Sequence, residues 1–487
     1  MHSDPIDTVL LIHGYSVRTL NSWGRLPDLL QGAGLQRQAI YLSAFVSLDD
    51  YVSCSDLAVA LEGKIAALER DQALDLGRTA LICHSTGAIV TRRWLLNRRS
   101  AGGKTPSHLI TCAGANHGST LAQLGRTELA QIFRELTQQT DVGRRVLEDL
   151  DYGSAFLRAL NREWIDAWND ANAPLWKDTY CFSMGGTDHS FWQNQLVWQS
   201  REPGSDGTVR ISGANLNYRF LDLKPPYDTV LPVVMAQPAP HLVAVNDNPA
   251  KVYSHTSQQA LDTKGLVLTG ATNVVEQLTH LGKKTVRVSS QTFGILEGIQ
   301  TPAERPFRAL QEAFAVQNDQ AYAALADAWY KESIAWTNAN PDEADATVVV
   351  AITAGDDVVD DSLVVIYDAS GLQSMTASVI GTPIKNELSP SIVSFYVNAA
   401  AFRATHPHSV HIEARTDTPY VTYDLEIDGP LSDDTVHSLT DNQFTYVNVE
   451  ATRDPSGALV LYSLANPGLP GILNANYPPF DPKVSRP

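Results

Sequence analysis

The ten residues LICHSTGAIV, 81–90, decide how this chain folds. The apolar segment 79–83 precedes Ser85 and has the pattern of a buried strand, and the segment after Ser85 has the pattern of a helix. A helix that begins directly after a serine points backbone N–H groups at an oxyanion formed there. Small residues, Cys83 and Gly87, flank the serine at two positions on either side, as a tight strand-to-helix turn requires. This context favours a nucleophile at Ser85 over a serine in an ordinary turn.

An upstream loop supports the same interpretation. The segment LLIHGYS, 10–16, places Gly14 and Tyr15 at the end of a strong apolar run. A glycine lets a loop approach its neighbours closely, because it has no side chain to collide with them. We therefore expect the backbone N–H groups of Tyr15 and Thr86 to form an oxyanion hole.

Strand and helix patterns alternate over the first part of the chain. Apolar runs at 8–12, 38–45, 79–83, 109–114 and 178–186 are separated by patterns with helical period, such as 56–70. Short strands separated by amphipathic helices predict a mostly parallel sheet with helices on both faces.

The pattern changes twice after that. Residues 126–176 are helical in pattern without an intervening strand, which predicts an inserted helical cap. Residues 293–340 predict a helical connector, and 341–487 predict an all-β, sandwich-like domain with a surface tail, because short strands follow one another without helices. The acidic turns and strand ends of this β-domain would suit a protein or surface partner better than chemistry.

Four motifs occur in an order that a known family uses. They are VLLIHGY (9–15), CHSTG (83–87), GANHGS (114–119) and GSDGTVRISGANL (204–216). With them the chain resembles an α/β-hydrolase of the lipase/esterase type over its first 290 residues or so, which sets the expected catalytic domain at 1–292. The family normally has glycine at the position of Cys83, and this departure would widen the turn slightly.

The resemblance implies a Ser-His-Asp triad in the order serine, acid, histidine. Asp206 in EPGSDGTVR is the expected acid, with Asp188 in GGTDHS as the alternative. His255 in VYSHTSQ is the expected base, with His241 in APHLVAV as the alternative. In this mechanism the Ser85 hydroxyl attacks a carbonyl carbon, and an acyl-enzyme forms and is hydrolysed.

Composition narrows the class of protein. The 487 residues carry a formal net charge of −18, which argues against a nucleic-acid partner. The clustered Arg92, Arg93, Arg98 and Arg99 are interpreted as complementing the C-terminal end of the helix after Ser85. Four cysteines are too few for a disulfide framework in a chain of this length.

The sequence also sets expectations about cofactors and location. No Gly-rich phosphate loop or metal-ligand spacing is evident, so no cofactor and no metal are expected. No apolar run has the length of a membrane span, and the N-terminus lacks the pattern of a signal peptide. A cytoplasmic location is therefore expected, with a mature secreted form as the alternative.

The expected function is hydrolysis of carboxylic esters by a serine esterase or lipase, with an ester or lipid as substrate. A phospholipase or a thioesterase would use the same triad. A protein that kept the fold as a non-catalytic acyl-binding or interaction module is the alternative from a different class.

Overall fold

The structure of the chain is a computed structural model. It describes residues 5–15, 23, 25–40, 49–119, 143–187, 204–206, 209–225, 232–244, 302–355, 357–359, 361–367, 383–386, 391–405, 408–415, 421–430 and 439–455.

A six-stranded sheet forms the first layer, and every pair of neighbouring strands in it is parallel. Its order is β2-β1-β3-β4-β5-β8. The strands are β1 (Thr8–Ile12), β2 (Gln36–Ile40), β3 (Thr79–His84), β4 (His108–Cys112), β5 (Tyr180–Gly186) and β8 (His241–Ala244). All residues of β3, β4 and β5 are buried, as expected for a parallel sheet covered on both faces.

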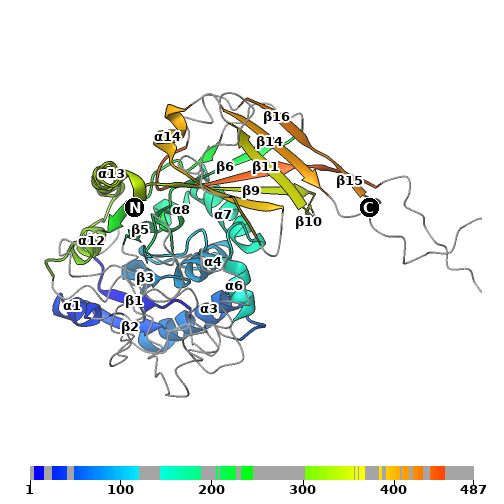
Figure 1. Cartoon of the computed structure of the whole chain (residues 1–487). Helices are drawn as coiled ribbons and strands as arrows, with labels where there is room; N and C mark the ends of the chain where they lie inside the picture. The colour runs from blue at the N-terminus through cyan, green and yellow to red at the C-terminus, as the bar shows by residue number, and fades with distance from the viewer. Residues whose placement is uncertain are drawn as a thin grey trace, which may run out of the picture.

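Helices cover both faces of this sheet (Figure 1). On one side lie α1 (Leu26–Gly32) and α12 (Arg305–Phe314), and on the other lie α3 (Cys54–Gln72) and α4 (Gly87–Ser100). Helix α13 (Asp319–Ala339) packs on β8, and α7 (Ala155–Trp168) packs on α4. The shorter helices are α6 (Arg144–Leu150), α8 (Leu175–Asp178), α10 (Ile211–Ala214) and α14 (Ala399–Ala404). The α/β layers predicted from the sequence are confirmed.

A second, mixed sheet follows the order β12-β13-β9-β17-β6-β7, and β10 pairs with β9. Its strands are β6 (Tyr218–Leu223), β7 (Val233–Val234), β9 (Ala346–Ala354), β10 (Asp357–Val358), β12 (Ile384–Lys385), β13 (Ile392–Val397) and β17 (Phe444–Glu450). A three-stranded sheet contains β11 (Asp361–Tyr367), β14 (Ser409–Arg415) and β16 (Glu426–Pro430). Strands β15 (Val421–Asp424) and β18 (Thr452–Pro455) form a two-stranded ribbon.

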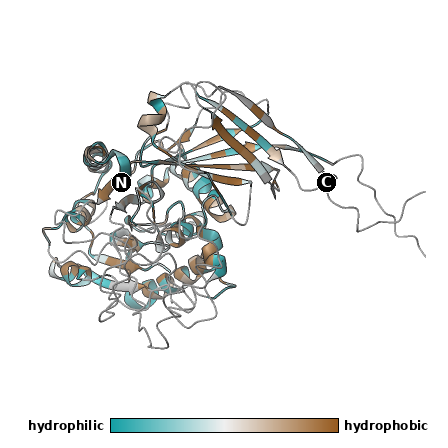
Figure 2. Ribbon diagram, in the orientation of Figure 1, coloured by the Kyte–Doolittle hydropathy of each residue, from teal (hydrophilic) through white to brown (hydrophobic). Residues whose placement is uncertain are grey.

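The central strands of the second sheet, β9, β13 and β17, contribute to a core on each face, and apolar strands of this region are brown in Figure 2. Side chains alternate between the faces of a strand. On β17, Phe444 and Tyr446 join the core of the first sheet, whereas Val447 and Val449 join a second core. That second core also holds residues of β11 and β14, so the second sheet and the three-stranded sheet pack as a sandwich.

Strand β6 connects the two halves of the chain. It lies within the segment 1–292 but pairs in parallel with β17, from Phe444↔Tyr218 to Val449↔Leu223. An apolar strand pattern states which residues are extended and does not state which strand will be their partner. The proposed boundaries at 292 and 340, and the cap at 126–176, stay predictions.

Among the described residues, no helix combines the length and the apolar character needed to cross a membrane.

Candidate active site

Ser85 lies on the turn between β3 and α4 in a strained conformation. Its φ is 54°, in the left-handed region that residues other than glycine rarely adopt. Such strain costs on the order of 1–3 kcal/mol and persists only where the surroundings fix the backbone. Ser85 O accepts hydrogen bonds from Ala115 N–H at 3.1 Å and Ala88 N–H at 3.0 Å, and Ser85 N–H donates to Cys112 O at 3.4 Å. Contacts from α4 and from the end of β4 therefore fix the turn.

Cys83 occupies the position where the family pattern has glycine. Its side chain is fully buried, and its thiol donates to Thr91 Oγ1 at 3.3 Å. Burial raises the pKa of this thiol to about 12, so it stays protonated at neutral pH. Because Ser85 keeps its left-handed backbone beside Cys83, the turn accommodates the cysteine.

Two glycines allow the loop after β1 to touch this turn. A Cβ on Gly14 would lie 2.7 Å from Ser85 Cβ, 3.0 Å from His84 O and 3.2 Å from Thr86 N. A Cβ on Gly87 would lie 2.7 Å from the backbone oxygen of His13. Distances this short leave no room for a methyl group, so the loop and the turn pack backbone against backbone.

This packing brings the two predicted oxyanion donors to one place. Thr86 caps the N-terminus of α4, and the first N–H groups of a helix have no acceptor within the helix. Tyr15 directly follows Gly14 in the loop that lies on the turn. The arrangement suits an oxyanion hole built from Tyr15 N–H and Thr86 N–H, which stays a prediction.

Buried aromatic rings pack against one another next to the loop after β1. His13 lies 4.6 Å from Trp23 and 5.9 Å from His84, measured between ring centroids. All three side chains are buried, and burial lowers the pKa of His13 to about 3. His13 and His84 therefore pack beneath the turn, and His13 is neutral at physiological pH.

Replacing Gly14 with alanine is expected to lower kcat by roughly a hundredfold, because the methyl group would push the loop away from Ser85 and displace one oxyanion donor. Gly63→Ala is the matched control, since a Cβ on Gly63 in α3 meets no atom within 4 Å. Steady-state kinetics on a soluble ester and a thermal melt would measure both variants. Full activity of Gly14→Ala would contradict the proposed place of the loop.

Asp206 lies in a tight buried turn. Its Oδ1 accepts from Val209 N–H at 2.8 Å, and its own N–H donates to Val209 O at 3.1 Å. The turn leads into α10, where Ile211 lies 3.4 Å from the Cβ position of Gly185 near the end of β5. Asp206 is thus placed towards the carboxyl ends of the parallel strands, the same side as Ser85. Its role as the acid stays a prediction.

His241 lies too far from the turn to accept a proton directly from Ser85. It pairs with Ser183 on β5, Ser183 pairs with Thr111 on β4, and Thr111 pairs with Cys83 on β3. Three strand spacings amount to about 14 Å. His241 Nδ1 lies 2.8 Å from Ser183 Oγ, and burial lowers the pKa of its ring to about 3. These are the properties of a packed strand residue.

The other two triad candidates, His255 and Asp188, lie outside the described residues. The structure therefore brings Ser85, Thr86 and Tyr15 together and leaves the contact between Ser85 and its base as a prediction.

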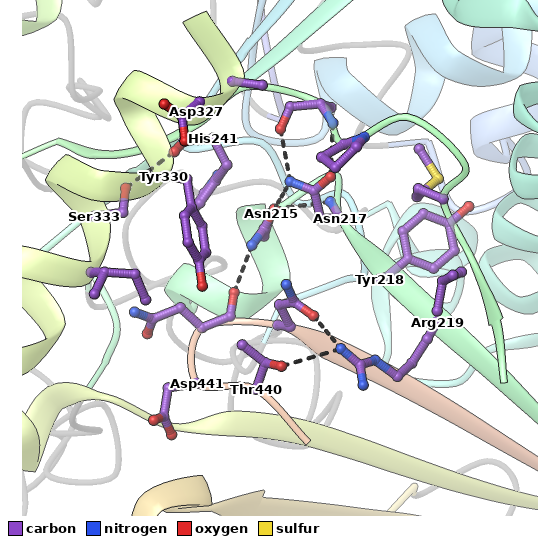
Figure 3. A pocket seen from close by; sticks show the side chains of 18 of the residues that line it. Asn215, Asn217, Tyr218, Arg219, His241, Asp327, Tyr330, Ser333, Thr440 and Asp441 are labelled. Carbon is purple, nitrogen blue, oxygen red and sulfur yellow. Dashed lines mark hydrogen bonds between the residues drawn. The ribbon is translucent and has the colours of Figure 1, made fainter. Parts of the chain in front are cut away.

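A cavity of about 480 Å³ lies between β6, α13 and the segment before β17 (Figure 3). Tyr330 and Arg219 line it, together with the start of β8 at His241. Arg219 donates to Thr440 Oγ1 at 3.3 Å and to Gln443 Oε1 at 2.6 Å. Since Ser85 is not among the lining residues, this cavity is not the expected ester pocket.

The arginine cluster after Ser85 separates into two kinds of residue. Arg98 pairs with Glu62 and Glu69, and Arg99 pairs with Asp178, so both bind neighbouring elements at the end of α4. Arg92 is instead fully buried, which the sequence analysis missed. The signal was present, because Arg92 follows the apolar Ala88 by four residues and so shares its face of the helix.

Comparison with known proteins bears on the fold. No protein-family model matches the chain, and no curated protein matches it. The structure is similar to phospholipase PlaB from Legionella pneumophila, with a TM-score of 0.71 and 21% identity over 96% of this chain and 98% of that one. A second PlaB structure, in complex with thio-NAD, has a TM-score of 0.71 and 20% identity over 95% and 97% of the two chains. The likeness covers both sheets.

Proposed function

The chain has the α/β-hydrolase fold, and we propose that it is a serine hydrolase that cleaves carboxylic esters. The observation that carries the proposal is the left-handed Ser85 at the start of α4, with the backbone of Gly14 packed directly against it. This geometry presents the Ser85 hydroxyl to an ester carbonyl carbon. It also directs backbone N–H groups at the oxyanion that develops in the reaction.

In the proposed reaction, Ser85 Oγ attacks the ester carbonyl carbon while His255 takes the hydroxyl proton. Asp206 orients the imidazole and stabilises its charged form. The N–H groups of Tyr15 and Thr86 bind the oxyanion of the tetrahedral intermediate. His255 then gives its proton to the departing alcohol, and the acyl group stays on Ser85. Water activated by His255 cleaves this acyl-enzyme, which releases the acid and restores the serine.

We propose a lipid ester as the substrate, and a phospholipid as the first candidate. The support is the likeness to PlaB, a phospholipase, which extends over the second sheet as well as the first. A lipase or thioesterase would use the same residues. A protein or surface partner of the C-terminal β-region stays a prediction.

A fluorophosphonate probe followed by an ester panel tests the proposal. We expect stoichiometric labelling of Ser85, because only an activated serine reacts with the probe. We also expect turnover of nitrophenyl esters that changes with acyl length, and release of fatty acid from phosphatidylcholine vesicles. A folded protein that is not labelled would instead be the non-catalytic acyl-binding module. Labelling with turnover of soluble esters but none of phospholipid would move the substrate to another ester class.

A further inference from the structure

We propose that Tyr446, on strand β17 of the second sheet, is a positioning residue for the nucleophile Ser85. Its hydroxyl fixes the loop after β4, residues 113–119, which in turn contacts the backbone of Ser85. The proposal rests on the proposed serine hydrolase function and names a residue that lies more than 300 positions away in the sequence from the site it supports.

The loop 113–119 is the direct neighbour of Ser85. Ala115 N–H donates to Ser85 O at 3.1 Å. A Cβ on Gly114 would lie 2.8 Å from Ala88 Cβ in the first turn of α4, so the loop packs closely on the helix as well. Ala113 has a φ of 44°, a left-handed conformation that, like that of Ser85, must be fixed by its surroundings. A displacement of this loop would therefore be transmitted to the strained backbone of Ser85.

His117 ties the loop to the second sheet, and its partners determine where its proton lies. His117 Nε2 lies 2.9 Å from Asn215 O, which can only accept, so Nε2 carries the hydrogen. Burial lowers the pKa of His117 well below its usual value, so the ring is neutral and Nδ1 is an acceptor. Tyr446 OH, 3.1 Å from Nδ1, is therefore the donor.

Asn161 on α7 makes the second hydrogen bond to the Tyr446 hydroxyl. Arg92 can only donate, so its bond of 2.8 Å to Asn161 requires the amide oxygen on that side. Asn161 Nδ2 then donates to Tyr446 OH at 2.8 Å. The hydroxyl must accept from Asn161 and donate to His117 at once.

Arg92 connects these hydrogen-bonded groups to α4. It is fully buried and, within the described part of the chain, forms no ion pair. Neutral groups surround it: Asn116 O at 2.9 Å, Asn161 Oδ1, and the ring of Trp164, 4.5 Å from the guanidinium carbon. A buried cation held by neutral acceptors depends on each of them, because an unsatisfied charge in the interior is costly. Arg92 thereby fixes Asn116 in the loop and Asn161 beside Tyr446.

Removing the Tyr446 hydroxyl should consequently affect the reaction more than the fold. In Tyr446→Phe, His117 Nδ1 and Asn161 Nδ2 each lose a buried partner, and the loop can relieve this by shifting. Small displacements of reacting groups lower rates steeply, by up to about a hundredfold for 1 Å. We expect kcat and the rate of Ser85 labelling to fall at least tenfold, with KM nearly unchanged.

Tyr322→Phe is the matched control. Tyr322 is also fully buried, and its hydroxyl donates to Cys181 O at 2.8 Å, between α13 and β5 and away from the loop. Tyr446→Phe loses two hydrogen bonds and Tyr322→Phe loses one, so both melting temperatures should fall, that of Tyr446→Phe further. Only Tyr446→Phe should lose kcat at a temperature where both proteins are folded. The overturning result is equal kcat for the two variants, or a wild-type kcat for Tyr446→Phe.

A second variant covers the case in which Tyr446→Phe does not fold. His117→Phe replaces the imidazole with an aromatic ring that has no nitrogens, and it should lower kcat at least as much. The loss of kcat in the double variant should then be much smaller than the product of the two single losses, because each single change already breaks the contact between Tyr446 and His117. Wild-type kcat in His117→Phe, or additive losses in the double variant, would refute the role of Tyr446. If the wild-type protein were not labelled at all, the failure would lie with the proposed function.

Discussion

Replacing Ser85 with alanine is expected to lower kcat by about 10⁴–10⁶-fold, because no other group in the proposed mechanism can form the acyl-enzyme. The fold should survive. Alanine removes only an oxygen, and the left-handed φ of 54° is set by contacts to the backbone, not by the hydroxyl. The measurement is kcat on a soluble ester, with a thermal melt of the same sample.

Ser107→Ala is the control for that experiment. Ser107 is buried just before β4, at the opposite end of the strand from the turn, and its hydroxyl lies 2.7 Å from His108 Nδ1. This variant should lose some stability, about 1 kcal/mol for a buried hydrogen bond, and keep its kcat. Retention of more than a small fraction of activity in Ser85→Ala would place the nucleophile elsewhere.

The second large effect is expected at the base. His255→Ala should lower kcat by on the order of 10⁴-fold, because Ser85 would lose its proton acceptor. His241→Ala is expected to keep most of its activity, since His241 lies about 14 Å from β3, the strand that leads into Ser85. Its main effect should be on stability, through the lost contact with Ser183.

The pair of histidine variants separates two mechanisms. An essential His241 with a dispensable His255 would mean that the segment after β8 carries no base and that the sheet must rearrange during the reaction. Addition of imidazole provides a further check, because a small base can partly replace a missing catalytic imidazole in a cavity that the alanine leaves behind. Partial recovery is expected for His255→Ala and none for Ser85→Ala.

Local sequence was sufficient to predict the turn at Ser85. Gly14 and Gly87 have no side chain because neighbouring atoms occupy that space: a Cβ would lie 2.7 Å from Ser85 Cβ at Gly14 and 2.7 Å from His13 O at Gly87. Such a constraint depends on a few residues close to two strand ends. This steric constraint therefore produces a motif of small residues that the sequence shows directly. The parallel layers around the turn are predicted by the apolar runs.

The strand pairing of the second sheet could not be predicted from the sequence. Neither 218–223 nor 444–450 was among the strands expected from the sequence, and the two segments pair across more than 200 residues. A strand pattern does not encode its partner. Arg92 presents a similar difficulty. Its position on the apolar face of α4 was visible, but a buried arginine is explained only by the acceptors around it, and those come from the loop after β4 and from α7.

The sequence by itself determined the α/β layers and the place of Ser85 on a strand-to-helix turn, because strand and helix periods and a steric motif are local properties of the chain. The α/β-hydrolase fold was what the resemblance of four motifs implied. Only the tertiary structure decided that Tyr446 of the second sheet reaches His117 in the loop that contacts Ser85, and that Asn161 and Arg92 complete the connection. The physical reason is that a buried polar group must find its partners in space. The identity of those partners depends on which strands and helices the whole fold brings together.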